Sequence, residues 1–289
     1  MISSMVRWFS PPIRVHIWGG FGSQLFGLVI AWRLSTSHRY RRVKLIFHTS
    51  GVSERVRELP LSWLSDYSIN EIQDFAKSRM GVEPSQSTST SKTLVSFLNS
   101  VLIRIGLLAR ANTDLELRRL KPWVLALRGH YTEFRLEDLE ITRLMSLFEI
   151  SKKRPFDNVL SIHYRLGDLL KLSSKSYIQP NRIKEALNHL SHKNIPVVIL
   201  SDSDSEVVSS LLASHLNERG SSYLRMSPID TIRSCVNSVE FLGTNSKLSL
   251  WIAIFRLSEG AMTALPRELL NHLENEIELE NQSQKLLVY

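Results

Sequence analysis

The chain has 289 residues, of which 43% are hydrophobic and 22% charged, and this composition excludes a disordered or a membrane-embedded protein. Its single cysteine, Cys235, excludes an internal disulfide and an all-cysteine metal cluster, and is typical of a reducing compartment. The formal net charge is +8, and residues 1–57, with nine basic residues and one acid, carry all of it. Such a region indicates either a phosphate-rich partner or a solvated basic face.

The N-terminal half predicts the start of a doubly wound α/β layer. A strand, a glycine-rich turn, a helix and a second strand are expected in that order, at residues 14–18, 19–22, 23–34 and 43–48. The longest apolar stretch, residues 94–109, is too short and too polar to span a bilayer. We interpret it as a helix packed in a core, with a helix lying on a membrane as the alternative. Residues 81–92 are expected to form a loop, and residues 115–127 and 136–148 to be largely helical.

Strands alternate with helices in the second half, which predicts a parallel sheet. Strands are expected at residues 159–163, 196–200 and 239–243, and helices at 181–190, 205–217, 247–257 and, as an acidic tail, 266–281. A linker at residues 151–157 divides the chain into an N-terminal α/β domain, 1–150, and a C-terminal α/β domain, 151–289. A cleft between two such domains is the expected place for a functional site.

Four of the twelve glycines, Gly19, Gly20, Gly22 and Gly27, fall within nine residues. Glycine between a strand and a helix lets backbone N–H groups approach a phosphate or a sugar closely. The spacing is not that of a dinucleotide-binding or Walker motif. We therefore predict ligand contacts at Gly20 and Gly22, with a plain tight turn as the alternative, and a hydrogen bond from Gln24 to a sugar hydroxyl.

The segment HYRLGD, residues 163–168, ends the first strand of the second half. Alternation along the strand places His163 and Arg165 on one face, and arginine is suited to bidentate contact with a diphosphate. The alternative is a salt bridge between Arg165 and Asp168.

Two further polar segments follow strands. Asp202-Ser203-Asp204 could chelate a divalent ion, but we favour a helix cap with one carboxylate facing a ligand. Asn245 or Ser246 is expected to cap the next helix, whose N–H groups could hold a phosphate. The nine histidines show no metal-binding spacing.

Together these segments resemble glycosyltransferase family 11, the α-1,2-fucosyltransferases. Residues 19–26, GGFGSQLF, resemble the family's GGLGNQMF; residues 163–168 resemble its HxRRxD; and residues 244–253, TNSKLSLWIA, resemble its SNSSFSWWAA. Weaker similarities lie at residues 129–132 and 200–202. The main departure is Leu166, which replaces the second arginine of HxRRxD.

The resemblance implies a GT-B-like fold of two Rossmann-like, doubly wound domains facing a cleft, with GDP-fucose as donor, and no cofactor or metal. It implies inverting transfer of L-fucose to the 2-hydroxyl of a galactose-type acceptor, with the C-terminal domain binding the GDP-sugar and the N-terminal domain the acceptor. The expected catalytic residues are Asp168 as base, Arg165 at the leaving diphosphate and His163 as orienting group. Donor contacts are expected from His163, Arg165, Asp202, Asn245, Ser246, Ser249, Gly20 and Gly22, and acceptor contacts from Gln24, His130 and Tyr131.

The expected setting is cytoplasmic, with peripheral contact at the inner face of the membrane through the basic N-terminal region. The acceptor is expected to be a glycan, such as a surface-polysaccharide repeat on a lipid carrier. Three alternatives remain: a related transferase with another nucleotide sugar or linkage, which Leu166 motivates; a pseudo-enzyme that binds the donor; and a nucleic-acid-binding protein. The last is disfavoured because the chain lacks interleaved aromatic platforms and known motifs of that kind.

Overall fold

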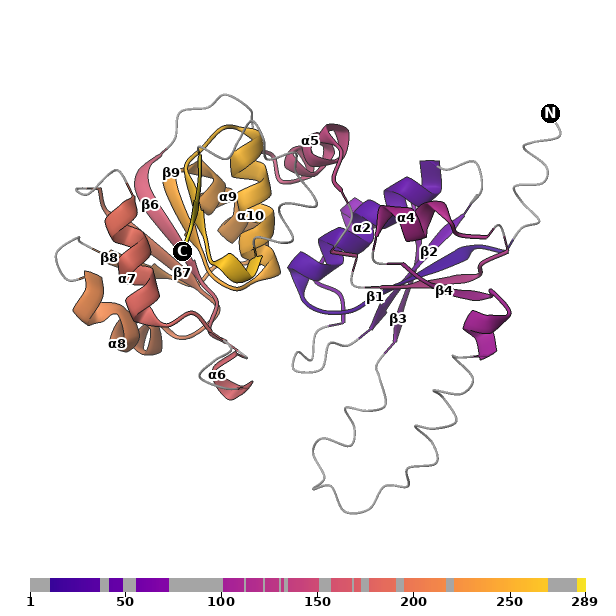
Figure 1. Cartoon of the computed structure of the whole chain (residues 1–289), viewed down its shortest axis with the longest axis horizontal. Helices are drawn as coiled ribbons and strands as arrows, with labels where there is room; N and C mark the ends of the chain where they lie inside the picture. Colours follow the sequence, from indigo (N-terminus) through magenta and orange to yellow (C-terminus); the bar gives the residue numbers. More distant parts are fainter. Residues whose placement is uncertain are drawn as a thin grey trace, which may run out of the picture. The chain divides into compact units, whose positions relative to one another are not determined.

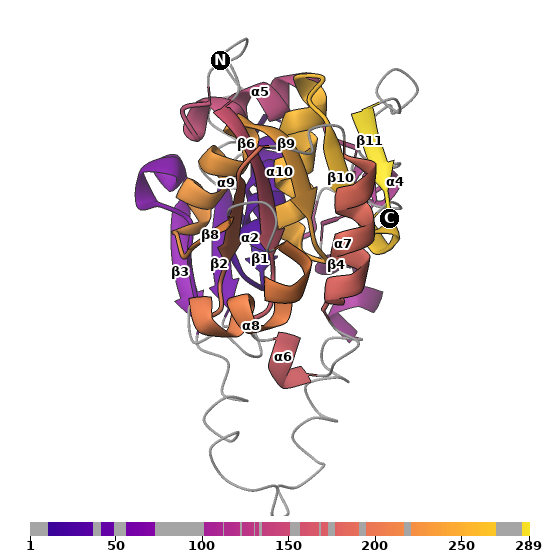
Figure 2. The ribbon, with the colours of Figure 1, turned by 90° about the vertical axis from the view of Figure 1, so that its left-hand side faces the viewer.

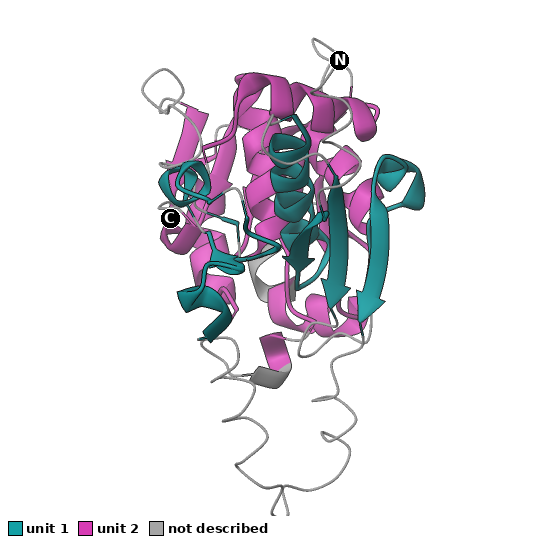
Figure 3. Cartoon of the chain, turned by 90° about the vertical axis from the view of Figure 1, so that its right-hand side faces the viewer, with its two compact units in different colours: residues 1–134 teal, residues 135–289 magenta. Residues whose placement is uncertain are grey.

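A computed structural model of the chain divides it into two compact units, residues 1–134 and 135–289, shown in separate colours in Figure 3. It describes residues 11–36, 42–48, 56–72, 101–111, 113–121, 123–129, 131–132, 135–150, 157–167, 169–172, 177–190, 195–216, 221–269 and 285–289. The boundary precedes the one expected at residue 150. The reason is that α5 (Asp138–Leu147) packs on α10 (Lys247–Ser258), and the Phe148 and Phe255 rings lie 5.5 Å apart.

Unit 1 contains a five-stranded parallel sheet in the order β3-β2-β1-β5-β4. The strands expected at residues 14–18 and 43–48 and the helix expected at 23–34 are confirmed (Figure 1). The described elements of unit 1 are β1 (Ile13–Ile17), α2 (Phe21–Thr36), β2 (Val43–His48), the 3-10 helix η1 (Leu61–Leu64), β3 (Ser68–Ile72), β4 (Leu108–Arg110), α4 (Asp114–Arg118) and β5 (Ala126–Arg128).

Helix α2 packs tightly on β1. Ile13, Val15 and Ile17 are buried on alternate positions of β1. A Cβ at Gly27 would lie 2.7 Å from the Ile17 side chain, so glycine is required for the helix to approach the strand this closely. The intervening residues, Arg14 and His16, are more exposed and lie on the opposite face of the sheet.

The helix predicted at residues 115–127 is wrong. Helix α4 begins with a capping box formed by Thr113 and Glu116 and ends at Arg118, and residues 126–128 form β5 between β1 and β4. The amides of Arg14 and Ala126 donate to the carbonyls of Leu125 and Leu107. These hydrogen bonds place β5 between two strands of the sheet, and this tertiary environment outweighs the local helical pattern.

Unit 2 contains a six-stranded parallel sheet in the order β11-β10-β9-β6-β7-β8. The predicted strands at residues 159–163, 196–200 and 239–243 and helices at 181–190, 205–217 and 247–257 are confirmed within a few residues. Besides α5 and α10, the described elements are β6 (Asp157–Tyr164), α6 (Leu169–Leu172), α7 (Pro180–His189), β7 (Val197–Ser201), α8 (Ser205–Leu216), β8 (Ser221–Leu224), α9 (Pro228–Asn237), β9 (Ser238–Gly243), β10 (Thr263–Leu265), the 3-10 helix η2 (Arg267–Leu269) and β11 (Leu286–Val288).

Helices cover both faces of the unit 2 sheet. Helices α7 and α8 lie on one side, where Ile183 and Leu212 pack with Leu160 and Ile162 of β6, while α9 and α10 lie on the other (Figures 1 and 2). Most of the acidic helix predicted at residues 266–281 lies outside the described residues. None of the described helices is long and apolar enough to cross a membrane.

Each sheet has one point where the strand order reverses. In unit 1 the chain proceeds outward from β1 through β2 to β3, and β5 lies on the other side of β1. In unit 2 it proceeds from β6 through β7 to β8, and β9 lies on the other side of β6. Ligands of open α/β sheets bind at the carboxyl ends of the strands beside such a reversal. Functional residues are therefore expected at the carboxyl ends of β6 and β9, and at those of β1 and β5.

Candidate functional site

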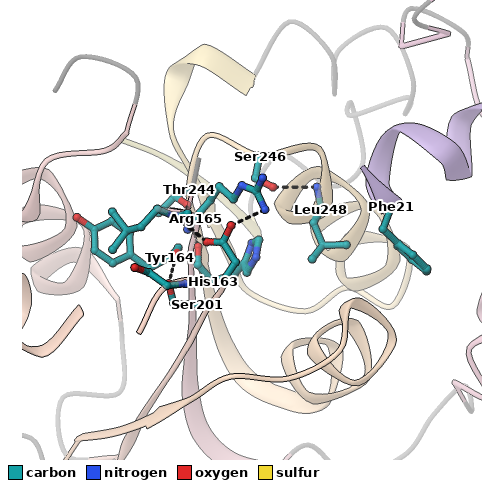
Figure 4. A network of polar contacts seen from close by, with 12 residues as sticks. Phe21, His163, Tyr164, Arg165, Ser201, Thr244, Ser246 and Leu248 are labelled. Carbon is teal, nitrogen blue, oxygen red and sulfur yellow. Dashed lines mark hydrogen bonds and ion pairs between the residues drawn. The ribbon is translucent and has the colours of Figure 1, made fainter. Parts of the chain in front are cut away.

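The carboxyl ends of β6 and β9 are joined by a polar network (Figure 4). His163 lies opposite Gly243 in the register of the two strands. The Thr244 hydroxyl donates to the His163 carbonyl and accepts the Arg165 amide, each at 2.9 Å. Thr244 is fully buried, so this hydroxyl fixes the end of β6 against the start of the loop after β9.

His163 contacts helix α10 through Ser249. Its Nδ1 lies 2.7 Å from the Ser249 hydroxyl, and that hydroxyl also accepts the Thr244 amide at 3.1 Å. Among the described groups, Nδ1 is the acceptor within reach of the Ser249 proton. This arrangement favours donation from the hydroxyl to Nδ1, and a neutral His163 would then carry its proton on Nε2.

Burial keeps His163 neutral. The side chain is 4% exposed, and burial, assisted by the nearby Arg165 cation, lowers the pKa of His163 to about 4, although Asp202 acts in the opposite direction. At neutral pH the imidazole is therefore a hydrogen-bond donor without a charge.

Arg165 forms an ion pair with Asp202, at 2.6 Å between Nη1 and Oδ2. The other carboxylate oxygen of Asp202 accepts the amides of Leu166 and Gly167, each at 3.0 Å. A Cβ at Gly167 would lie 2.1 Å from Asp202 Oδ2, so only glycine leaves this carboxylate in place. Asp202 thus orients both the guanidinium and the loop after β6. Asp168, the expected base and the alternative partner of Arg165, lies outside the described residues.

Leu166 is fully buried in the core that contains Leu160 and Ile162, on the side covered by α7 and α8. The position at which the family motif has its second arginine is thus a core position in this chain.

The two carboxylates of Asp202-Ser203-Asp204 have different partners. Asp204 lies 3.2 Å from Arg225 on the surface, and its carbonyl accepts the Val208 amide as α8 begins. Asp204 therefore occupies the helix-cap position that was predicted. Within the described ranges no three His, Cys, Asp or Glu side chains gather as a metal site would require.

The predicted cap of α10 is confirmed at Ser246, whose hydroxyl accepts the Leu248 amide at 3.1 Å. Asn245 precedes it and is exposed. The 12-residue helix α10 thus begins in the loop that follows β9, and its N-terminus is the positive end of its dipole. The same loop contacts Arg165, because the Arg165 amide donates to the Thr244 hydroxyl.

A hollow of about 480 Å³ lies at the carboxyl ends of β7 and β8. Its apolar base contains Ile199 and Val208, Tyr223 lines one side, and Asp204 and Arg225 lie at its rim. It adjoins the candidate site because Ser201 and Ser203, on either side of Asp202, both line it.

The glycine turn in unit 1 is occupied by groups of the chain itself. The Glu58 carboxylate accepts the Phe21 amide at 2.8 Å, at the N-terminus of α2. The Gln24 side chain is 1% exposed; its oxygen accepts the amides of Glu58 and Leu59, and its nitrogen donates to the carbonyls of Gly19 and Val56. These four bonds use the capacity of the amide, so Gln24 holds the turn in place instead of binding a sugar.

A cluster at the ends of β1, β2 and β5 was missed by the sequence analysis. The ring nitrogens of His16 and His48 lie 2.8 Å apart, and the Trp18 ring stacks on that of His48 at 4.4 Å. Arg128 lies opposite His16 in the register and 5.9 Å from the centre of the Trp18 ring. Burial, followed by His48 and the cations of Arg128 and Arg14, lowers the pKa of His16 to about 3. The signal available was a histidine near the end of each of two adjacent predicted strands.

Tyr131 is buried beneath this cluster. Its hydroxyl lies within hydrogen-bond distance of the carbonyls of His16 and Leu127, and burial raises the pKa of the phenol. Its backbone has φ of 56°, a strained conformation for a non-glycine residue. His130 lies outside the described residues.

No protein-family model and no curated protein sequence matches the chain. Among solved structures it is similar to E. coli heptosyltransferase WaaC with ADP, with a TM-score of 0.46 and 10% identity over 96% of this chain and 92% of the other. It is similar to NodZ α-1,6-fucosyltransferase co-crystallized with GDP, with a TM-score of 0.40 and 10% identity over 85% and 93%. It is also similar to POFUT1 in its apo-form, with a TM-score of 0.37 and 12% identity over 89% and 98%. At such identities the reaction has to be argued from the site itself.

Proposed function

We propose that this chain is a GT-B glycosyltransferase of the family 11 type that transfers L-fucose from GDP-fucose to a hydroxyl of a galactose-type acceptor. The observation that carries the proposal is the constellation at the order reversal of unit 2. Arg165, the neutral His163 and the start of α10 lie around the ends of β6 and β9. A cation, an uncharged donor and a helix N-terminus are the groups that a nucleotide diphosphate requires.

Arg165 would stabilise the leaving diphosphate. A guanidinium has five N–H donors, so the ion pair of Nη1 with Asp202 is compatible with contact to a phosphate through other donors. The dipole of α10 adds roughly half a positive charge at its N-terminus. Together they would offset the charge that develops on the β-phosphate as the glycosidic bond breaks, without a divalent ion.

His163 would orient the donor through Nε2. Donation from the Ser249 hydroxyl to Nδ1 would leave the proton on Nε2, and Nε2–H would donate to an oxygen of the diphosphate or of the sugar. A neutral imidazole suits this role because it is a directional hydrogen-bond donor, while the positive charge is supplied by Arg165.

The nucleobase would occupy the hollow beside Tyr223. The hollow lies at β7 and β8, two strand spacings from the ends of β6 and β9, or about 10 Å. An extended nucleoside diphosphate covers a similar span. The aromatic ring of Tyr223 and the Asp204 carboxylate at the rim would provide stacking and an acceptor for the N–H groups of guanine.

Unit 1 would bind the acceptor at the cluster of His16, Trp18 and His48. Indole rings provide apolar surface for the C–H faces of sugars, and the histidine pair provides hydrogen bonds to hydroxyls. Asp168 remains the proposed base for the attacking hydroxyl, on the strength of the resemblance of residues 163–168 to the family motif.

The test is a donor screen with a matched pair of arginine variants. GDP-fucose, GDP-mannose, UDP-sugars and GDP would be compared for their effect on the melting temperature, since a ligand that binds only the folded state stabilises it. Arg165→Ala should lose roughly 10–100-fold in GDP affinity, as expected for a charge-assisted hydrogen bond to phosphate of about 1.5–3 kcal/mol. Arg143→Ala removes an exposed arginine of α5 in unit 2 that does not line the hollow, and it serves as the control.

The result distinguishes the proposal from its alternatives. Protection by GDP and GDP-fucose that Arg165→Ala abolishes and Arg143→Ala retains would support the donor site. Protection by another nucleotide sugar alone would indicate a related transferase. If the chain binds GDP-fucose but releases no GDP when a panel of galactosides is offered as acceptors, it would be a pseudo-enzyme. Equal GDP affinity in Arg165→Ala and the parent chain would refute the assignment of the site.

A further inference from the structure

Unit 1 exposes a group of apolar side chains on the turn before β4. Residues 101–104 are helical, and the chain turns into β4 through Gly106. Here we define the basic apolar patch as Val101, Leu102, Ile103, Ile105 and Trp123, together with the cations Arg104 and Lys121. The apolar residues of the patch are exposed at 37% (Val101), 38% (Leu102), 36% (Ile103), 55% (Ile105) and 54% (Trp123).

The backbone of this turn is defined by a helix cap at Gly106. Gly106 has φ of +77°, and the Leu107 and Gly106 amides donate to the carbonyls of Leu102 and Ile103, each at 3.0 Å. This is a Schellman motif, which ends the helix at Ile105. Because neighbouring helical positions point in different directions, exposure from Val101 to Ile103 means that the helix end is apolar around most of its circumference.

Trp123 continues this surface. A Cβ at Gly106 would lie 2.9 Å from the indole nitrogen of Trp123, so the ring lies directly against the turn. The Lys121 ammonium lies 5.4 Å from the centre of the ring. The patch is therefore contiguous although its two parts are separated in the sequence. The interpretation of residues 94–109 as a core helix is wrong for the described residues 101–105.

The two segments that carry the patch contain cations and no acid. Residues 101–111 and 118–129 contain no acid in the sequence. The exposed cations of these segments are Arg104, Arg110, Arg118, Arg119 and Lys121. Two basic residues of the N-terminal region form ion pairs within unit 1: Arg33 lies 2.6 Å from Asp114, and Arg57 lies 2.7 Å from Glu71.

We propose that the basic apolar patch docks unit 1 on the surface of an anionic lipid bilayer. Aliphatic side chains and an indole insert at the boundary between headgroups and acyl chains, while surrounding cations contact anionic headgroups. A second copy of this chain fits less well, because a symmetric interface would bring Arg104 and Lys121 of each copy toward those of the other. A nucleic acid offers no apolar surface for four aliphatic side chains. The proposal is independent of the reaction assigned above.

The experiment uses the full chain and vesicles of phosphatidylcholine, alone or with 30% phosphatidylglycerol. The parent chain should sediment with the anionic vesicles and less so at 0.5 M salt, because exposed charges are screened. Ile105→Asp and Lys121→Glu should each lower the bound fraction at least fivefold. Leu139→Asp and Lys184→Glu make the same chemical changes at exposed positions of unit 2 and should bind as the parent does.

A second measurement does not depend on loss of binding. Trp123→Phe should still bind, but quenching of tryptophan fluorescence by brominated acyl chains should fall, because Trp123 is the indole placed in the interface. Thermal unfolding of each variant would verify that it folds. Ile105→Asp with parental binding, or unchanged quenching in Trp123→Phe, would overturn the proposal. So would a dimer in solution that Ile105→Asp converts to a monomer, since the patch would then be an interface between two copies.

Discussion

The protonation of His163 provides a test of the unit 2 site that needs no substrate. We expect the free energy of unfolding to depend on pH through this side chain, and His163→Asn to remove that dependence. Asparagine retains an oxygen that can accept the Ser249 hydroxyl at the place of Nδ1, but it does not titrate. His189→Asn, on the exposed side of α7, is the matched control.

The sign follows from the lowered pKa. The folded chain holds the pKa of His163 at about 4, against 6.5 for an ordinary histidine, so the unfolded chain takes up the proton first as the pH falls. The stability that neutral His163 contributes is fully present above pH 6.5 and is lost progressively toward pH 4. With about 1.4 kcal/mol for each unit of pKa, the loss between pH 7 and pH 5 is roughly 2 kcal/mol.

Urea denaturation followed by circular dichroism at pH 7, 6 and 5 measures this loss, and hydrogen exchange of peptides from β6 assigns it to unit 2. The difference in unfolding free energy between the parent chain and His163→Asn should change by roughly 2 kcal/mol over this range. His16 is present in both proteins and cancels in the difference. A difference that stays constant from pH 7 to pH 5 would refute the buried, neutral state of His163 and with it the donor role of Nε2–H.

Three further outcomes are expected. Gly167→Ala should destabilise unit 2 by roughly 1–3 kcal/mol and weaken GDP protection. The added Cβ would lie 2.1 Å from the Asp202 carboxylate and would displace it from Arg165. A thermal melt that shows parental stability would contradict this geometry. Asp168→Asn should reduce turnover by roughly 10²–10⁴-fold with little change in GDP affinity, and an unchanged turnover number would remove it as the base. Transfer should be insensitive to EDTA, and loss of activity that Mn²⁺ restores would require a metal in place of Arg165 and the α10 dipole.

The sequence was most informative where local pattern and tertiary environment agree. The alternating strands and helices of unit 2 are visible as short apolar runs and amphipathic segments, and Ser246 as a cap follows from hydroxyl chemistry. The pattern failed at β5, whose three residues are a strand only because β1 and β4 flank them. It could not reveal that Asp202 is the partner of Arg165, because that contact depends on the pairing of β6 with β7. Nor could it show that the Gln24 side chain forms four hydrogen bonds with backbone groups, since its partners lie more than 30 residues away or in the turn itself.

The ion pair of Arg165 and Asp202 decides how the proposed donor site would work. A guanidinium that faced only solvent would bind any anion and would have to be ordered at each binding event. Here Asp202 holds Arg165 through one oxygen and the loop after β6 through the other, so the cation and the loop are positioned before a donor arrives. That arrangement lowers the entropy lost on binding, but it also neutralises part of the charge. Strong binding of a diphosphate therefore needs the additional donors of His163 and the start of α10, and this requirement would favour a ligand that reaches all three over a simple phosphate.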